Sequence, residues 1–298
     1  MTRHIGFVGL GNMGGPMAAN LVKAGYRVSG FDLAPQALRQ AEAAGVQAAG
    51  SGAEAAREAD LVITMLPAGR HVLAAYAELL PAARSGTYFV DCSTIDVADA
   101  RAAHDLATAA GHRAVDAPVS GGVAGASAAS LTFMTGAAQP DFDAVRPVLE
   151  AMGRKVVHCG PSGAGQAAKI CNNMILGISM IAVGEAFVLG ESLGLSHQAL
   201  FDVASTASGQ CWALTSNCPV PGPVPASPAN RGYAAGFAAA LMAKDLGLAA
   251  GAAEAAGLPT ELGRRAAQLY ASFAAGEGAG LDFSAIITTL KAEKEDAE

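Results

Sequence analysis

The sequence predicts an α/β domain with a mostly parallel, doubly wound sheet, followed by an all-α domain that is joined to it by a long central helix. Three observations predict this organisation. Short apolar runs alternate with alanine-rich helical stretches up to about residue 160, a long stretch without a strong turn signal begins at Gly163, and only helical patterns follow. Strands that alternate with helices imply a parallel sheet covered on both faces. We therefore place the boundary near residue 163, which gives domains 1–162 and 163–298.

The elements expected in the first domain follow this alternation. Strands are expected at residues 5–8, 27–31, 61–66, 87–91, 113–116, 131–134 and 156–157. Helices are expected at residues 13–24, 35–44 and 97–110. The strands are short and apolar, as is typical of strands that are buried on both faces.

The second domain begins with the longest apolar stretch of the chain. A helix over residues 163–193 would be roughly 45 Å long, and because it is apolar nearly all round we expect neighbouring helices to bury it. Further helices are expected at residues 196–205, 236–256 and 260–274. The segment 207–233 contains five prolines and Trp212. It is either a flexible surface loop or a functional segment, part of which closes over a ligand.

The composition excludes several classes of protein. The 298 residues carry a net charge of −7 and no basic run, which argues against a nucleic-acid-binding protein. The apolar run at 5–10 is short and lacks a cleavage site, and the stretch 174–190 contains Gly184 and Glu185, so we expect neither a signal peptide nor a membrane span. Five cysteines without CxxC spacing and six histidines without metal-ligand spacing predict reduced thiols in the cytoplasm and no metal site.

A glycine-rich turn links the first expected strand to the first expected helix. It consists of Gly9, Leu10, Gly11, Asn12, Met13 and Gly14. Gly9 permits a tight turn, Gly11 lets the backbone approach a pyrophosphate, and Gly14 lets the helix pack against the strand. The helix N-terminus adds N–H groups and a partial positive charge. Strand, turn and helix in this order predict a Rossmann-type dinucleotide-binding domain.

An acidic residue at the end of the second expected strand indicates which dinucleotide binds. Asp32 lies 18 residues after Gly14. A carboxylate at this place accepts hydrogen bonds from the adenosine ribose and repels a 2′-phosphate, so NAD is the predicted cofactor. Arg39 keeps NADP open as an alternative, because an arginine in this region can reach a phosphate.

A second glycine pair follows the strand that ends at Asp116. Ser120, Gly121 and Gly122 can present a hydroxyl and two unhindered N–H groups. Successive N–H groups suit a carboxylate ligand, although two adjacent glycines are also compatible with a simple turn.

Two lysines lie in apolar helical surroundings. Lys169 and Asn173 are four residues apart on the long helix and therefore point from one face. Burial favours the neutral form of an amine, and an amine that exchanges protons can serve a carbonyl reduction or its reverse. Lys169 can also be an ordinary lysine that faces solvent at a helix start. Lys244 lies on an expected apolar face with Phe237, and either binds a ligand or pairs with a carboxylate such as Asp245.

Four motifs resemble those of the β-hydroxyacid dehydrogenases, in matching order and spacing over almost the whole chain. They are residues 7–21, 116–122, 163–173 and 244–248. Residues 65–67, 92–95 and the region of Trp212 are most similar to the 3-hydroxyisobutyrate dehydrogenases within that family. This resemblance implies NAD-dependent oxidation of 3-hydroxyisobutyrate, a small 3-hydroxy acid, to methylmalonate semialdehyde in valine degradation. It also implies a homodimer or homotetramer.

The resemblance further implies roles for individual residues. Lys169 would be the catalytic acid/base, and Asn173 would hold Lys169 or the substrate. The implied substrate-binding residues are Ser120, Gly121, Gly122, Lys169, Asn173, Trp212 and Phe237. The implied cofactor-binding residues, besides the glycine turn and Asp32, are Leu66, Pro67, His71, Thr94 and Lys244.

Three other activities stay open. A tartronate semialdehyde reductase would share every motif, and the substrate shape around Trp212 and Phe237 would decide. An imine reductase would usually replace the lysine, so Lys169 argues against it. A non-catalytic NAD-binding regulator would bind NAD tightly without turnover of any 3-hydroxy acid.

Overall fold

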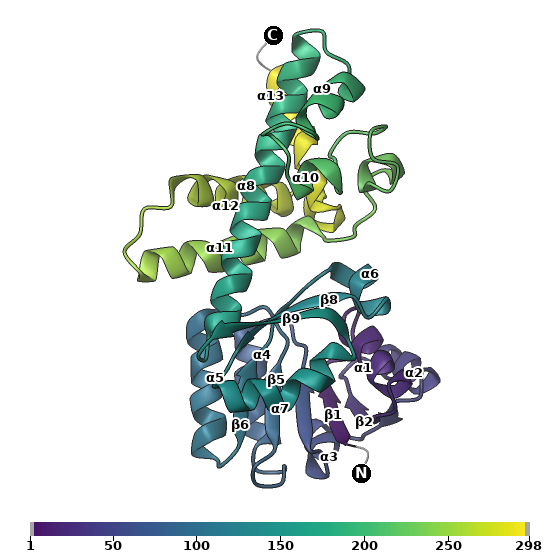
Figure 1. The fold of residues 1–298 in the computed structure, drawn as a ribbon, viewed down its shortest axis with the longest axis vertical. Coiled ribbons are helices and arrows are strands. Elements are labelled where there is room, and N and C mark those ends of the chain that lie inside the picture. The colour runs from purple at the N-terminus through teal and green to yellow at the C-terminus, as the bar shows by residue number, and fades with distance from the viewer. Residues whose placement is uncertain (1–2, 296–298) are drawn as a thin grey trace. The chain divides into compact units, whose positions relative to one another are not determined.

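The protein divides into two compact units in a computed structural model that describes residues 3–295. The first unit spans Met1–Lys169 and the second spans Ile170–Glu298. Figure 1 labels the elements of both units, which are described separately below.

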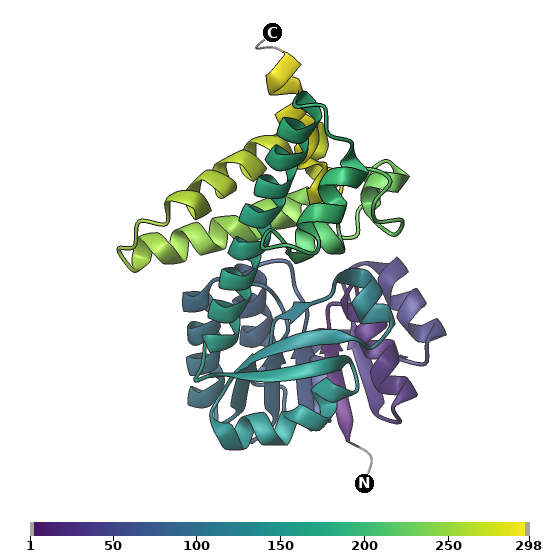
Figure 2. The ribbon, with the colours of Figure 1, turned by 45° about the horizontal axis from the view of Figure 1, so that its top comes forward.

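The first unit is built on one nine-stranded sheet with the order β3-β2-β1-β4-β5-β6-β8-β7, and β9 pairs with β8. The strands are β1 (His4–Val8), β2 (Arg27–Phe31), β3 (Gln47–Ala48), β4 (Leu61–Thr64), β5 (Tyr88–Asp91), β6 (Arg113–Asp116), β7 (Val119–Ser120), β8 (Leu131–Gly136) and β9 (Gly153–Gly160). Strands β1 to β6 pair in parallel. Strand β8 is antiparallel to β6 and β7 and parallel to β9, which Figure 2 shows from the side of β8 and β9. The mostly parallel sheet predicted from the sequence is confirmed.

Helices cover both faces of this sheet. One face packs against α1 (Gly14–Lys23), α2 (Pro35–Ala43) and α7 (Gln139–Glu150), and the other against α3 (Gly52–Arg57), α4 (Gly69–Leu79) and α5 (Val97–Ala109). Successive strand side chains point to opposite faces. Phe89 therefore lies in one apolar cluster with Tyr76, and the next residue, Val90, lies in the other. This double layer is the predicted doubly wound arrangement.

The short helix α6 (Gly122–Ser127) and the long helix α8 (Ala164–Ser192) follow strands of the sheet. Helix α8 is long and apolar enough to cross a membrane by length and composition, a test that the core helices of soluble proteins also pass. It was expected to be buried all round, and this expectation is wrong. In an apolar stretch of 18 residues within α8, only 39% is buried, and the side chains of Ile175 and Leu189 are 65% and 60% exposed.

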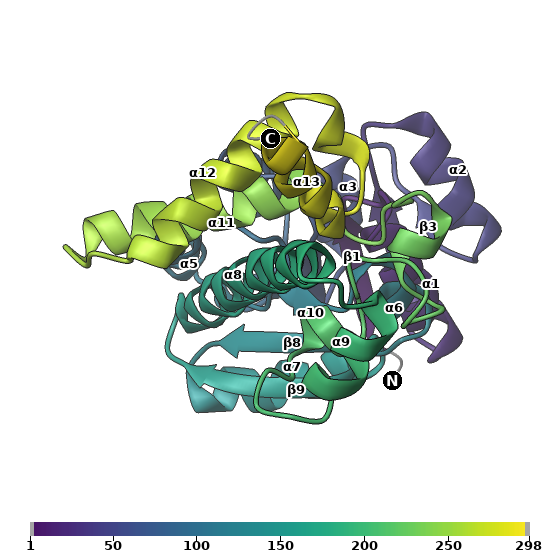
Figure 3. The same ribbon diagram turned by 90° about the horizontal axis from the view of Figure 1, so that it is seen from above.

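The second unit consists of helices that pack around α8. They are α9 (His197–Ala204), α10 (Trp212–Thr215), η1 (Pro228–Arg231), α11 (Ala239–Ala255), α12 (Glu261–Ala275), η2 (Glu277–Gly280), η3 (Phe283–Ile286) and α13 (Ile287–Glu295). The core of this unit joins Met180 and Ile181 of α8 to Met242, Tyr270 and Phe283. Figure 3 shows α11 and α12 as a hairpin beside α8. The all-α character predicted for the C-terminal half is confirmed.

The proline-rich segment 207–233 is held by its own hydrogen bonds. The Tyr233 hydroxyl donates to the carbonyl of Pro219 over 2.8 Å, and the backbone N–H of Gly222 donates to the Asn230 side chain over 2.9 Å. The Ser227 hydroxyl donates to the carbonyl of Cys218. The segment therefore has a defined local structure.

Candidate functional site

The glycine turn joins β1 to α1 with the geometry that its glycines were expected to allow. Gly9 has a φ of +94°, and a Cβ there would lie 2.3 Å from the Met65 carbonyl oxygen. A Cβ on Gly14 would lie 1.9 Å from the Gly9 carbonyl oxygen. A Cβ on Gly11 would meet open space. Gly9 and Gly14 are thus required by the protein's own packing, whereas Gly11 leaves room for another molecule to approach the backbone.

Asp32 lies at the end of β2 and fixes the same turn. Its Oδ2 accepts a hydrogen bond from the backbone N–H of Leu10 over 2.6 Å, and its Oδ1 accepts one from Ala34 over 2.7 Å. A carboxylate has about four lone-pair sites, so this half-exposed group retains acceptor capacity for ribose hydroxyls. The residues therefore fit a dinucleotide with a free 2′-hydroxyl.

Three other candidate cofactor residues of this unit follow β4 and β5, the two strands that come after β1 in the order of the sheet. Leu66 and Pro67 follow β4, which pairs with β1, and Thr94 follows β5, which pairs with β4. Carboxyl ends of parallel strands meet at one edge of a sheet, which is where ligands bind in open α/β folds. His71 lies in the first turn of α4, and its buried Nδ1 has no hydrogen-bond partner among residues 3–295.

A buried carboxylate connects two of these loops. Asp91 ends β5, and its Oδ1 accepts hydrogen bonds from the Thr64 hydroxyl over 2.7 Å and from the Ser93 hydroxyl over 2.6 Å. The Ser93 oxygen in turn accepts the backbone N–H of Leu66 over 2.8 Å. Asp91 therefore orients the segments that carry Leu66 and Thr94.

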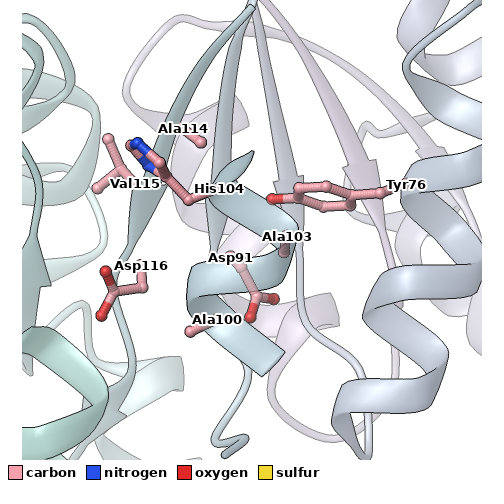
Figure 4. Close-up of a pocket in the computed structure, with 8 residues that line it drawn as sticks. All are labelled: Tyr76, Asp91, Ala100, Ala103, His104, Ala114, Val115 and Asp116. Atoms are coloured by element: carbon pink, nitrogen blue, oxygen red, sulfur yellow. The ribbon is translucent and has the colours of Figure 1, made fainter. Parts of the chain in front are cut away.

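Asp91 also lines a small cavity. This cavity has a volume of about 10 Å³ and is lined from α4, β5, α5 and β6, with Tyr76, His104 and Asp116 among its polar side chains (Figure 4). Within the described part of the chain, Asp91 Oδ2 and His104 Nδ1 have no hydrogen-bond partner. Burial raises the pKa of Asp91 to about 6, although the hydrogen bonds from Ser93 and Thr64 oppose that shift. The cavity has room for one water-sized group.

A second buried carboxylate, Asp116, holds the first turn of α8. Its Oδ1 accepts the backbone N–H of Gly163 over 2.7 Å, and its Oδ2 accepts that of Gln166 over 3.0 Å. Burial raises the pKa of Asp116, and these backbone hydrogen bonds oppose the shift. Gly165 is required here, because its Cβ would lie 2.3 Å from the Met134 carbonyl oxygen.

Lys169 and Asn173 lie one turn apart on α8, with 6% and 2% of their surface exposed. The Nδ2 of Asn173 donates to Asp245 Oδ2 over 2.5 Å, and its Oδ1 accepts from Asn172 over 3.0 Å. The orientation of the Asn173 amide is therefore set by both neighbours. Burial of the Lys169 side chain excludes the alternative of a lysine that faces solvent.

Lys244 forms an ion pair of 3.3 Å with the buried carboxylate of Asp245. The expected apolar face through Phe237 and Lys244 is wrong, because α11 begins only at Ala239 and its buried face runs through Met242, Asp245 and Leu246. Of the two alternatives for Lys244, a ligand or a carboxylate partner, the structure shows the pairing with Asp245.

The remaining candidate substrate residues belong to both units: Ser120, Gly121 and Gly122 to the first, and Trp212 and Phe237 to the second. Ser120 ends β7 opposite Thr132 of β8, and Gly121 and Gly122 follow with φ values of +133° and +61°. Trp212 begins α10 and is 54% exposed. Phe237 packs edge-to-face on Phe283 at 5.8 Å between ring centroids.

Sequence reasoning missed the buried polar residues that hold this machinery. One of them, Asp282, accepts hydrogen bonds from the backbone N–H groups of Gly236 and Phe237 and from the Asn217 amide. The others are Asp91, Ser93 and Gln166. Ser93 and Gln166 lie inside the motifs at residues 92–95 and 163–173. The one signal that could have indicated such residues is a polar side chain within an otherwise apolar stretch. Among the described residues, no group of three or more His, Cys, Asp or Glu side chains is placed to hold a metal ion.

Comparison with known proteins covers nearly the whole chain. Residues 4–160 match the family model of the NAD-binding domain of 6-phosphogluconate dehydrogenase. Residues 163–290 match a second family model, which is described as the NAD-binding part of NADP-dependent 3-hydroxyisobutyrate dehydrogenase.

Relatives and solved structures agree with these matches. A probable 3-hydroxyisobutyrate dehydrogenase of Mycobacterium tuberculosis is 58% identical over 97% of this chain and 98% of its own length. An NAD-dependent L-serine dehydrogenase of Pseudomonas aeruginosa is 46% identical, over 95% of this chain and 96% of its own. The solved structure of the M. tuberculosis 3-hydroxyisobutyrate dehydrogenase with L-serine has a TM-score of 0.95 at 57% identity, and covers 98% of this chain and 100% of that one. By its sequence over nearly its full length and by its fold, this chain belongs to the 3-hydroxyisobutyrate dehydrogenase family.

Proposed function

We propose that this protein oxidises 3-hydroxyisobutyrate to methylmalonate semialdehyde with NAD, as a step of valine degradation. The observation that carries the proposal is the burial of Lys169 on α8. The first turn of this helix is fixed by Asp116, which ends β6 of a sheet of the dinucleotide-binding type. The 58% identity to a probable 3-hydroxyisobutyrate dehydrogenase supports the same substrate.

In this proposal the protein's own groups move one proton. The neutral amine of Lys169 accepts the proton of the substrate hydroxyl. The carbon bonded to that hydroxyl loses a hydride, and the carbon–oxygen bond becomes a carbonyl. NAD supplies the hydride acceptor when it is bound. The burial of Lys169, which is 6% exposed, supports this role because it keeps the amine out of bulk water. Asn173, with its amide orientation set by Asp245, holds the amine or the substrate oxygen.

Further roles belong to the same proposal. Ser120, Gly121 and Gly122 bind the substrate carboxylate, and Trp212 and Phe237 shape the substrate site. The cofactor is held by the turn Gly9–Gly14 and by Asp32, Leu66, Pro67, His71, Thr94 and Lys244. The carboxylate of Asp32 favours NAD over NADP by repelling a 2′-phosphate.

We also propose that residues 163–298 form a substrate and oligomerisation domain, and that the chain acts as a homodimer or homotetramer in the cytoplasm. The exposed apolar side chains of Ile175 and Leu189 on α8 support a contact with another copy, because exposed apolar patches mark interaction surfaces.

L-Serine is a second candidate substrate. It is also a 3-hydroxy acid, a 46% identical relative is named an NAD-dependent L-serine dehydrogenase, and a structure at 57% identity was solved with L-serine.

One experiment tests these substrates together. The purified protein is mixed with NAD and, separately, with 3-hydroxyisobutyrate, L-serine and glycerate, and the absorbance of the reduced cofactor is followed; tartronate semialdehyde is tested with NADH. We expect the highest kcat/KM with 3-hydroxyisobutyrate. A higher value with L-serine would reassign the substrate, a preference for tartronate semialdehyde would indicate the reductase, and NAD binding without any turnover would indicate a regulator.

A further inference from the structure

The side chain of Gln166 is fully buried and joins α8 to the loop that carries Thr94. Its Nε2 donates to the carbonyl oxygen of Ser93 over 2.7 Å, and its Oε1 accepts the backbone N–H of Ile95 over 3.1 Å. None of its surface is exposed. The two backbone groups lie on either side of Thr94, so one amide holds the loop at both of its flanks.

A primary amide of this length satisfies both partners at once. The Ser93 carbonyl needs a donor and the Ile95 N–H needs an acceptor, and both are buried. An ionised glutamate offers only acceptors, a lysine offers only donors, and a methionine of similar length offers neither group at useful strength. A buried backbone group that loses its partner is costly, so the loop would move rather than stay in place.

The same turn of α8 carries the proposed catalytic group. Gln166 and Lys169 are three residues apart and therefore lie on adjacent positions of one helix face. The backbone N–H of Gln166 is itself fixed by Asp116. The loop around Thr94 is thereby tied to a helical turn that has little freedom to shift.

The hydrogen bonds continue from this loop to the next one. The hydroxyl of Ser93 accepts the N–H of Leu66 and donates to Asp91. An unbroken series of hydrogen bonds therefore runs from Leu66 through Ser93 to Gln166. Its two ends are a proposed cofactor contact and the helix turn that carries Lys169.

We propose that Gln166 is a positioning residue, which sets the distance between the cofactor loop at Thr94 and the amine of Lys169. This inference rests on the proposed function, because it assigns Gln166 to the relative placement of the hydride acceptor and the proton acceptor. Gln166 acts through Thr94 and Lys169 and does not itself touch the reacting atoms.

The test compares Gln166→Met, which removes both hydrogen bonds, with Gln166→Glu, which keeps the acceptor for Ile95. The matched control is Gln139→Met, because Gln139 is an exposed glutamine of the same unit whose side chain donates a hydrogen bond to Asp143. The measurements on the full chain are the NAD dissociation constant, kcat at saturating NAD and 3-hydroxyisobutyrate, the primary isotope effect with substrate deuterated at C3, and Tm.

For Gln166→Met we expect weaker NAD binding and, since a displacement of about 1 Å can cost on the order of 100-fold in rate, kcat lower by about that factor. The isotope effect should rise, because hydride transfer becomes the slow step. Gln166→Glu should approach the wild type at low pH, where a protonated carboxyl can donate to Ser93 and accept from Ile95. At high pH, where the ionised carboxylate only accepts, it should change the same quantities in the same direction as Gln166→Met, and Gln139→Met should match the wild type at both pH values. Gln166→Glu replaces Gln166→Met in the test if the methionine variant does not fold.

A purely structural role would lower Tm and leave the NAD dissociation constant, kcat and isotope effect as in the wild type, and this result overturns the proposal. Failure of the proposed function is distinguishable from it. In that case the wild type would turn over no 3-hydroxy acid, and unchanged NAD binding in Gln166→Met would still count against the role of Gln166.

Discussion

Replacing the buried carboxyl of Asp91 with an amide should change how stability depends on pH. Burial raises the pKa of Asp91 from 3.8 to about 6. Below pH 3.8 the carboxyl is protonated in both the folded and the unfolded chain, so ionisation has no effect on stability. As the pH rises from 3.8 to about 6, the unfolded chain ionises first, and above this range the folded protein must hold a buried charge. Stability is therefore lost with rising pH, and the full loss is about 3 kcal/mol at 1.36 kcal/mol per pKa unit.

The Asp91→Asn variant keeps an oxygen for Thr64 and Ser93 and replaces Oδ2, which has no hydrogen-bond partner among the described residues, with an amide nitrogen. It has no charge to bury at any pH. Between pH 5 and pH 8 the wild type should lose about 1 kcal/mol through this one group, by the linkage relation with pKa values of 3.8 and about 6. The variant should gain stability relative to the wild type by that amount over the same range.

Urea unfolding of both proteins at pH 5 and pH 8 measures this difference, since titrating groups that do not interact with Asp91 cancel in the comparison. The control is Asp105→Asn, because Asp105 is exposed on α5 and its removal should leave the difference between the two pH values unchanged. An Asp91→Asn protein whose stability relative to the wild type is equal at pH 5 and pH 8 would refute the reasoning. The buried charge would then be compensated by an interaction that this account omits.

Three further substitutions test the proposed site. Lys169→Met should lower kcat by roughly 10²–10⁴-fold, the range for loss of a general acid or base, while NAD binding measured by fluorescence is retained; near-normal turnover would remove Lys169 from the reaction. Gly9→Ala should lower Tm and weaken NAD binding, because the Cβ would lie 2.3 Å from the Met65 carbonyl oxygen at a φ of +94°; a variant that binds NAD as the wild type does would contradict this. Asp32→Ala should lower the ratio of kcat/KM with NAD to that with NADP, and an unchanged ratio would show that Asp32 does not select the cofactor.

The parts of the fold that were predictable are those with a strong local signal. The strand at Arg113–Asp116 was expected with the bounds it has, and α1 and α8 differ from their expected bounds by about one residue at each end. In each case an apolar run of the right length lies between clear turn or cap residues. Glycines after β1 also carried a chemical reason, and the positive φ of Gly9 agrees with it.

Elements with weak or conflicting local signals were missed. Strands β3 and β7 contain two residues each, which is too short for a period to be seen. Helix α7 carries Pro140 in its first turn and Pro147 in its interior, and prolines normally argue against a helix. Tertiary packing overrides that preference here, because Phe142, Val145 and Leu149 are buried in the sheet's core.

The exposure of α8 was not predictable from its own composition. A helix of 29 residues is about 44 Å long, whereas α11 and α12 have 17 and 15 residues and span about 26 and 23 Å. Neighbours of that length cannot cover α8 from end to end. The apolar periodicity reports what the helix can bury, and not which neighbours the rest of the chain supplies.

The sequence predicted the candidate residues that would contact cofactor or substrate, because they lie in local motifs. It did not predict the hydrogen-bond partners that hold these residues, because the partners are distant in the sequence. Asp116 and Gln166 are 50 residues apart, and Asn173 and Asp245 are 72 apart, so no spacing rule in one sequence joins them. These carboxylates are buried, and burial raises the pKa of both Asp91 and Asp116, which is unfavourable for stability near neutral pH. Hydrophobic residues at these strand ends would pack without that cost, but they would leave the loops at Leu66 and Thr94 and the first turn of α8 without fixed partners. The retention of charged acceptors where strands end is therefore best explained by the need to fix loop positions, since a fixed geometry is what hydride and proton transfer require.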